Sequence, residues 1–81
     1  MSELGILLRN ARFRRNLFQR EVADRTGVPR TKISHYERGR QLPSERNLDK
    51  MLKLYSPDLE TKQLIRQLWE QEKVKYKSWS V

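Results

Sequence analysis

The sequence predicts a small all-α domain, a compact bundle of four or five helices. Apolar residues recur at helical spacing along most of its 81 residues. Residues that often begin or end helices separate these stretches, among them Gly27, Ser44 and Ser56. Only 36% of the residues are hydrophobic, so the core must be small, and a partner subunit is one way to complete it.

The first helix is expected to begin after Ser2, a suitable N-cap, and to run to about Arg15. Its buried face should consist of Leu4, Leu8 and Ala11. Further apolar residues on this helix, Ile6, Leu7 and Phe13, exceed what one core face requires. They could contact the C-terminal segment or form a subunit interface.

Residues 19–38 read as two short helices joined by a tight turn. Gly27 follows the first helix and can adopt left-handed backbone without steric cost. In the second helix Ile33 and Tyr36 should face inward. The other positions are polar or cationic, namely Arg30, Thr31, Lys32, Ser34, His35 and Arg38. Such a helix suits the major groove of DNA.

Two more helices are expected after this pair. Ser44 is a suitable N-cap for a helix whose apolar stripe is Leu48, Met51, Leu52 and Tyr55. Pro57 suits the first position of the last helix, which could continue to Lys73 or further. Residues 74–77 alternate in polarity, so a strand or a loose arm competes with helix there.

Charge and composition indicate a polyanionic partner. The net charge is +8, and residues 1–40 hold ten Lys and Arg against four acids, whereas residues 41–81 hold eight against six. The chain has no cysteine and one histidine, so we expect no metal site and no cofactor. It shows no bilayer-spanning run, signal-peptide pattern or evident small-molecule site, and we expect a cytoplasmic location of bacterial or phage type.

Residues in register along roughly two-thirds of the chain carry a family resemblance. They are Leu4, Gly5, Leu8, Arg12, Gln19, Val22, Ala23, Gly27, Val28, Ile33, Tyr36, Glu37, Arg38, Gly39, Pro43, Leu48 and Leu52. The chain resembles the lambda-repressor-like, or Cro/Xre-type, helix-turn-helix DNA-binding family. The resemblance implies a DNA-binding core over 1–56, with the motif at 19–38, and stops near Ser56. Beyond it, residues 57–81 are expected to form a C-terminal helix and tail, a possible dimerisation element. One departure is Phe18, where the family usually carries a serine or threonine N-cap.

The resemblance also implies roles for individual residues. Base reading would fall to Arg30, Thr31, Ser34 and His35, although Arg30 could instead be solvated or bind a phosphate and His35 could reach a phosphate. Phosphate binding would fall to Gln19, Lys32, Arg38, Arg40, Gln41 and Ser44. Arg12 and Glu37 would form a structural ion pair rather than contact DNA. The sequence does not show which way Arg14, Arg15 and Arg20 face.

These features favour a sequence-specific regulator of transcription, most economically a repressor that binds an inverted-repeat operator on double-stranded DNA as a homodimer. Candidate interface residues lie on the last helix and after it, namely Leu64, Ile65, Leu68, Trp69 and Tyr76, although this face could instead cap the monomer core. One alternative is a DNA-binding antitoxin or interaction module whose C-terminal segment binds a protein partner, and RNA binding is a variant. An enzyme is not expected, because the sequence has no Gly-rich phosphate loop, no paired histidines and no convincing acid pair.

Overall fold

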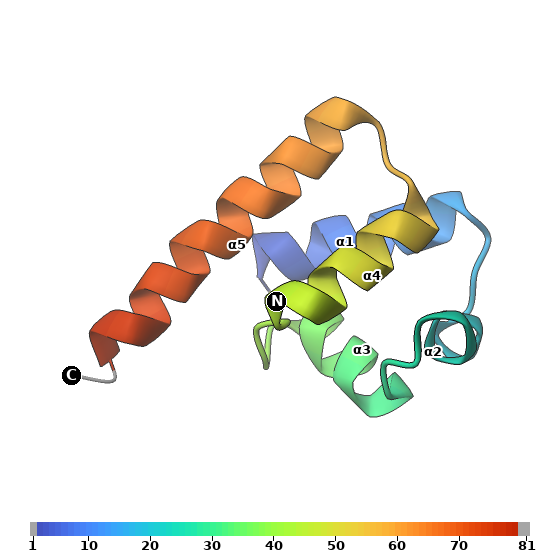
Figure 1. Ribbon diagram of the computed structural model, residues 1–81, viewed down its shortest axis with the longest axis horizontal. Helices are drawn as coiled ribbons and strands as arrows, with labels where there is room; N and C mark the ends of the chain where they lie inside the picture. The colour runs from blue at the N-terminus through green and yellow to red at the C-terminus, as the bar shows by residue number, and fades with distance from the viewer. Residues whose placement is uncertain (1, 80–81) are drawn as a thin grey trace.

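The computed structural model describes residues 2–79, with side chains through Lys75, and within this range it has five helices and no strand (Figure 1). The helices are α1 (Glu3–Arg14), α2 (Gln19–Thr26), α3 (Arg30–Arg38), α4 (Glu45–Tyr55) and α5 (Leu59–Trp79). The all-α fold predicted from the sequence is confirmed. None of these helices combines the length and apolar character needed to cross a membrane.

The five helices share one hydrophobic core. Helix α1 contacts α3, α4 and α5, while α2 packs against α3 and α4. In Figure 1, α1 and α4 cross the middle of the molecule, α2 and α3 lie below them, and α5 begins above them and descends along the left side. The buried apolar residues are Leu4, Leu8, Ala11, Leu17, Val22, Val28, Ile33, Tyr36, Leu48, Met51, Leu52, Tyr55, Ile65 and Trp69. The apolar stripes predicted for α1, α3 and α4 therefore face this core.

Side-chain caps fix where three of the helices begin. Ser2 Oγ accepts a hydrogen bond from Gly5 N at 3.0 Å, and Ser44 Oγ accepts one from Asn47 N at 3.1 Å, as the sequence predicted. The prediction that Pro57 opens the last helix is wrong by two residues. Helix α5 begins at Leu59, and the carboxylate of Asp58 caps it by accepting a hydrogen bond from Thr61 N at 3.4 Å, which a proline side chain cannot do.

The alternative of a strand or loose arm over 74–77 is also wrong, because α5 continues through these residues to Trp79. Its middle is anchored to the rest of the domain. Trp69 Nε1 donates a hydrogen bond to Pro43 O at 2.7 Å, and Arg66 pairs with Asp49 of α4. The C-terminal turns extend past the other helices (Figure 1).

Candidate nucleic-acid interface

The turn between α2 and α3 sets the direction of α3. Gly27 has a φ of 77°, and its N–H donates to Ala23 O at 2.9 Å, which ends α2. Thr26 Oγ1 donates to the carbonyl of the last α2 turn, at Val22 O, and accepts from Val28 N at 3.2 Å. With Val28 fully buried, the turn is held from both sides, so α3 leaves it in one orientation.

The outer face of α3 carries the predicted base-reading residues. Arg30 and Thr31 are exposed, while Ser34 and His35, one turn further along, are half-buried. The opposite face of the helix is buried in the core. Burial of that face leaves the polar residues as the surface that α3 can present to a ligand.

Beneath this face lies a buried ion pair between α1 and α3. Arg12 Nε donates to Glu37 Oε2 at 2.7 Å, and Arg12 Nη2 donates to Glu37 Oε1 at 2.9 Å. Arg12 is 7% exposed and Glu37 is 3% exposed. Arg12 Nη1 also donates to Leu17 O at 2.9 Å. The hydrogen bond to Glu37 raises the pKa of Arg12, so the guanidinium stays charged despite its burial.

Gln19 joins this pair at the N-terminus of α2. Its Nε2 donates to Glu37 Oε1 at 3.1 Å, so the carboxylate accepts three hydrogen bonds in total. A primary amide has two N–H groups, and the second remains for another acceptor. The sequence did not predict this bond. It was missed because Gln19 and Glu37 are 18 residues apart and either could have faced solvent.

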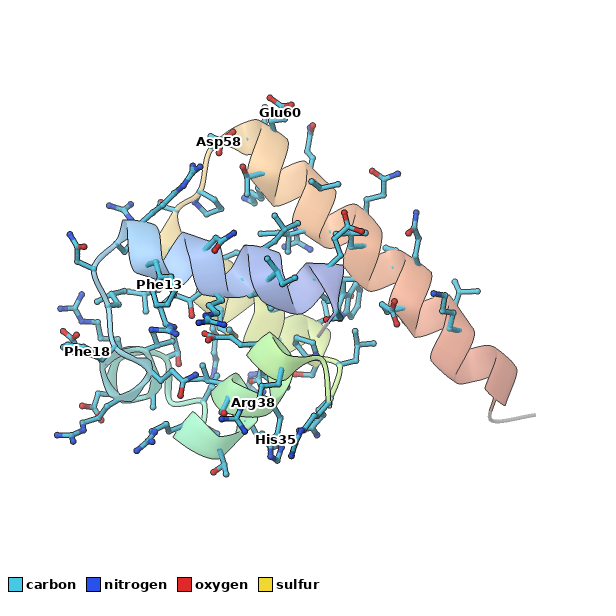
Figure 2. The ribbon with its side chains drawn as sticks, turned by 180° about the vertical axis from the view of Figure 1, so that it is seen from behind. Phe13, Phe18, His35, Arg38, Asp58 and Glu60 are labelled. Carbon is cyan, nitrogen blue, oxygen red and sulfur yellow. The ribbon has the colours of Figure 1, made fainter. Side chains whose placement is uncertain are left out.

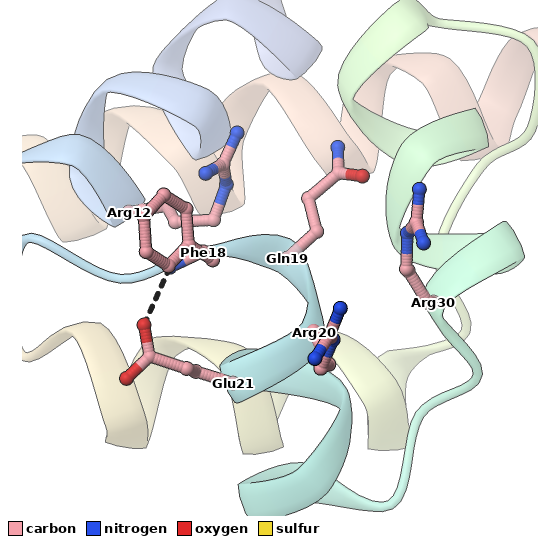
Figure 3. A pocket seen from close by; sticks show the side chains of 6 residues that line it. All are labelled: Arg12, Phe18, Gln19, Arg20, Glu21 and Arg30. Carbon is pink, nitrogen blue, oxygen red and sulfur yellow. Dashed lines mark hydrogen bonds between the residues drawn. The ribbon is translucent and has the colours of Figure 1, made fainter.

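A hollow of about 620 Å³ opens in front of this end of α2, and its lining includes Gln19, Arg20 and Arg30 (Figure 3). Phe18 stands at its rim as the N-cap and is 75% exposed. Its side chain cannot accept a capping bond, but Glu21 Oε1 accepts from Phe18 N at 3.0 Å. Backbone N–H groups at the start of α2 therefore lie beside two arginines, an arrangement suited to an anion.

The remaining predicted phosphate contacts lie on α3 and on the loop that follows it. Arg38, Arg40, Gln41 and Ser44 are exposed, as is Lys32 on α3 itself. The oxygen of Ser44 already caps α4, which leaves its hydroxyl hydrogen as a donor. Trp69 fixes the loop through Pro43, a contact between residues 26 apart that the sequence did not reveal.

The structure also shows which way the arginines of unknown direction face. Arg20 lies at the hollow beside Arg30. Arg14 and Arg15 line a different hollow, between α1 and the link from α4 to α5, and Arg15 Nε donates to Tyr55 O at 2.7 Å. Arg14 and Arg15 therefore lie outside the hollow at α2.

The candidate interface residues of α5 do not form one exposed face. Ile65 and Trp69 are buried within the monomer, at 0% and 4% exposure. Leu64 is 40% exposed and Leu68 is half-buried. The side chain of Tyr76 lies outside those that the structure describes. Ile65 and Trp69 thus cap the monomer core.

The further apolar residues of α1 also differ in how deeply they are buried. Leu7 packs against the core, whereas Ile6 is 42% exposed and Phe13 is 50% exposed.

Among the side chains that the structure describes, no group of three or more His, Cys, Asp or Glu residues could hold a metal ion.

Comparison with known proteins agrees with this geometry. A family model described as a helix-turn-helix domain matches residues 3–64. Over 57 residues the chain is 39% identical to the "ImmF control region 10 kDa protein" of Bacillus phage phi105, a match that covers 70% of this chain and 63% of that protein. The chain thus spans less than two-thirds of this relative's length. No solved structure matches. Because the family model matches most of the chain and the α2–turn–α3 geometry agrees with it, the chain belongs to the helix-turn-helix family of DNA-binding domains. Its motif residues are those of the lambda-repressor-like type.

Proposed function

We propose that this protein is a sequence-specific regulator of transcription that represses by occupying an inverted-repeat operator as a homodimer. The observation that carries the proposal is the outer face of α3. It presents a row of hydrogen-bonding side chains while its other face is fixed to the core and to the Arg12–Glu37 pair. The phage relative is named for a control region, which supports a regulatory role.

Base reading is assigned to the N-terminal half of α3. Arg30 is exposed at the first position of the helix and can donate two parallel hydrogen bonds to guanine O6 and N7, worth ~1–3 kcal/mol of discrimination. Thr31 can bond a base or place its methyl group against thymine. Ser34 and His35 lie about one turn further along and reach the next base pairs or a phosphate.

Phosphate contacts on either side of the groove hold the helix in register. Gln19 at the start of α2 serves one side, through the amide hydrogen that Glu37 does not use. Arg38 lines a hollow together with Gln19 and serves the same side, while Arg40, Gln41 and Ser44 serve the other side and Lys32 lies on α3. These contacts raise affinity without reading sequence, and each phosphate that a lysine or arginine neutralises adds ~0.9 to the slope of log affinity against log salt.

A single α3 spans few base pairs, so the proposal includes a two-fold dimer on half-sites ~34 Å apart. Since Ile65 and Trp69 are used inside the monomer, the interface on α5 is assigned to Leu64, with Leu68 at its edge. Sedimentation at micromolar concentration, alone and on operator DNA, tests this part. A monomer under both conditions would contradict it.

A second candidate function is binding of a protein partner through α5, as in a DNA-binding antitoxin. Exposed apolar residues at the start of the helix and in its C-terminal half favour it, since Leu59 is 68% exposed and Val74 is 61% exposed. Co-purification of a stoichiometric second polypeptide from the native host would support this alternative. Loss of that polypeptide in a Val74→Lys variant would place the contact on α5.

The experiment that tests the main proposal is selection of duplexes from a random library at ~0.05 and ~0.2 M salt, because higher salt removes binding that depends on phosphates alone. An inverted repeat enriched at both concentrations is the expected result. Lack of any enriched motif, with binding lost at the higher salt, would contradict sequence-specific regulation and leave a non-specific DNA binder.

A further inference from the structure

A second hollow adjoins the one at the start of α2. It has a volume of about 230 Å³ and is bounded by Arg9 and Phe13 of α1 and by Arg38 at the end of α3. It shares Arg12 and Gln19 with the larger hollow, so the two form one strip across α1, α2 and α3. Figure 2 looks onto this side of the molecule, with Phe13 above and Arg38 and His35 below.

The charge of this second hollow is positive. Its one carboxylate, that of Glu37, already accepts two hydrogen bonds from Arg12 and one from Gln19. Arg9 and Arg38 are both exposed, and neither forms an ion pair with any of the described side chains. Two cations without a local counter-charge facing one depression favour an anionic ligand.

Phe13 gives the hollow an apolar wall and orients the neighbouring arginine. The guanidinium carbon of Arg9 lies 5.3 Å from the centroid of the ring, and that of Arg12 lies 4.7 Å from it, within the range of cation–π contacts. Half of the Phe13 surface remains exposed. An exposed ring beside two cations offers apolar contact to one part of a ligand and charge to another.

We propose that the DNA-contacting surface extends onto α1 through this hollow. Arg9 and Arg38 bind adjacent backbone phosphodiesters, next to the phosphate bound at the start of α2, and Phe13 packs against the deoxyribose beside the phosphate of Arg9. Duplex DNA fits because it repeats an anion and an apolar sugar at every nucleotide, and because the hollow is continuous with the face that carries Arg30. This inference rests on the proposed function, and it adds Arg9 and Phe13 to the contacts implied by the family resemblance.

The test compares Arg9→Gln with Arg14→Gln on the selected operator. Both residues are exposed arginines of α1, but Arg14 lines the hollow near Asp58 instead. For Arg9→Gln the slope of log affinity against log salt should fall by ~0.9, so that the loss of affinity is about 3.5-fold greater at ~0.05 M than at ~0.2 M salt. Arg14→Gln should keep the slope of the unmodified protein.

Phe13→Ala separates the apolar contact from the charge. Removing a sugar contact releases no counterion, so affinity should fall by the same factor at both salt concentrations. Ethylation of individual operator phosphates should show one interfering position that is lost only in Arg9→Gln. Circular dichroism melting of each variant controls for folding.

Two results would overturn the inference. One is an unchanged salt slope and an unchanged ethylation pattern in Arg9→Gln. The other is a Phe13→Ala protein that binds operator normally but changes its sedimentation, which would make this surface a protein interface. If the base preference of Arg30→Ala changes while Arg9→Gln behaves as the unmodified protein, only this inference fails. If neither the unmodified protein nor any variant selects a DNA sequence, both this inference and the proposed function fail.

Discussion

Replacing Glu37 by alanine should destabilise the fold more than any change on the outer face of α3. The substitution removes the acceptor of three hydrogen bonds at 2.7, 2.9 and 3.1 Å and leaves the guanidinium of Arg12 with its single bond to Leu17 O. Because Arg12 is only 7% exposed, its charge is largely shielded from water once the carboxylate is lost.

The size of the effect follows from this burial. Breaking a buried ion pair by removing one partner costs ~3–5 kcal/mol. A domain of this length has a total stability of roughly 4–12 kcal/mol, so the loss is a large fraction of it. At ~4 °C per kcal/mol, the smallest slope for a domain of this size, even the lower estimate lowers the melting temperature by about 12 °C.

Circular dichroism melting and urea unfolding measure this loss, and a double variant provides the matched control. In Arg12→Met/Glu37→Met both charges are gone and the side-chain volume is largely kept, so the double variant should be more stable than Glu37→Ala alone. It still leaves Leu17 O and one N–H of Gln19 without partners, so it should stay below the unmodified protein.

Two results would refute this reasoning. The first is a Glu37→Ala protein that melts within a few degrees of the unmodified protein, which would mean that the pair is open to water in solution. The second is a double variant that is less stable than Glu37→Ala, which would mean that the unpaired charge of Arg12 does not destabilise the fold.

Three further predictions concern single side chains elsewhere. Gly5→Ala should destabilise by ~1–3 kcal/mol or more, measured by urea unfolding, because the new Cβ would lie 2.8 Å from Tyr36 O in the backbone of α3. Tyr55→Phe should gain up to ~1 kcal/mol, since the buried hydroxyl has no hydrogen-bond partner among the described residues. Burial raises the pKa of Tyr55, so the unmodified protein should lose stability as the pH rises past the ordinary range of tyrosine, and Tyr55→Phe should lose less in the same alkaline melts. The hydroxyl of Thr61 donates to the carboxylate of Asp58 and lowers the pKa of Asp58. This bond therefore stabilises the fold above the ordinary carboxyl range, and the contribution is lost as the pH falls through the lowered pKa. In Thr61→Val the pKa of Asp58, measured by NMR titration, should return toward its ordinary value.

Local signals explain why the positions of the helices could be predicted. Gly27 marks the turn because few residues adopt its positive φ, and Ser2 and Ser44 mark helix starts because their hydroxyls accept N–H groups three residues on. The end of α5 carried no such signal. Alternation over 74–77 is compatible with a strand, but the described chain offers no strand to pair with it, and the helix continues.

Long-range contacts could not be predicted from the residues alone. The position of Arg12 opposite Glu37 came from the family resemblance, because many cations in the chain could have paired with this carboxylate. Gln19 was expected to bind a phosphate, but one of its two amide N–H groups donates to Glu37 instead. Trp69 was considered as an interface residue, and only the folded chain shows its indole bound to Pro43 O. A helical period tells which residues share a face but not what covers that face.

The central claim is that the first turn of α3 reads bases, and the base preference of Arg30→Ala tests it most directly. Libraries of operator variants would be bound by the unmodified protein, by Arg30→Ala and by Lys53→Ala, which removes an exposed cation from α4. We expect Arg30→Ala to lose ~1–3 kcal/mol of discrimination at one symmetric position in each half-site while every other position and the Lys53→Ala profile stay unchanged. A uniform loss of affinity with all base preferences intact would contradict the claim, because it would make Arg30 a phosphate contact and place sequence reading elsewhere.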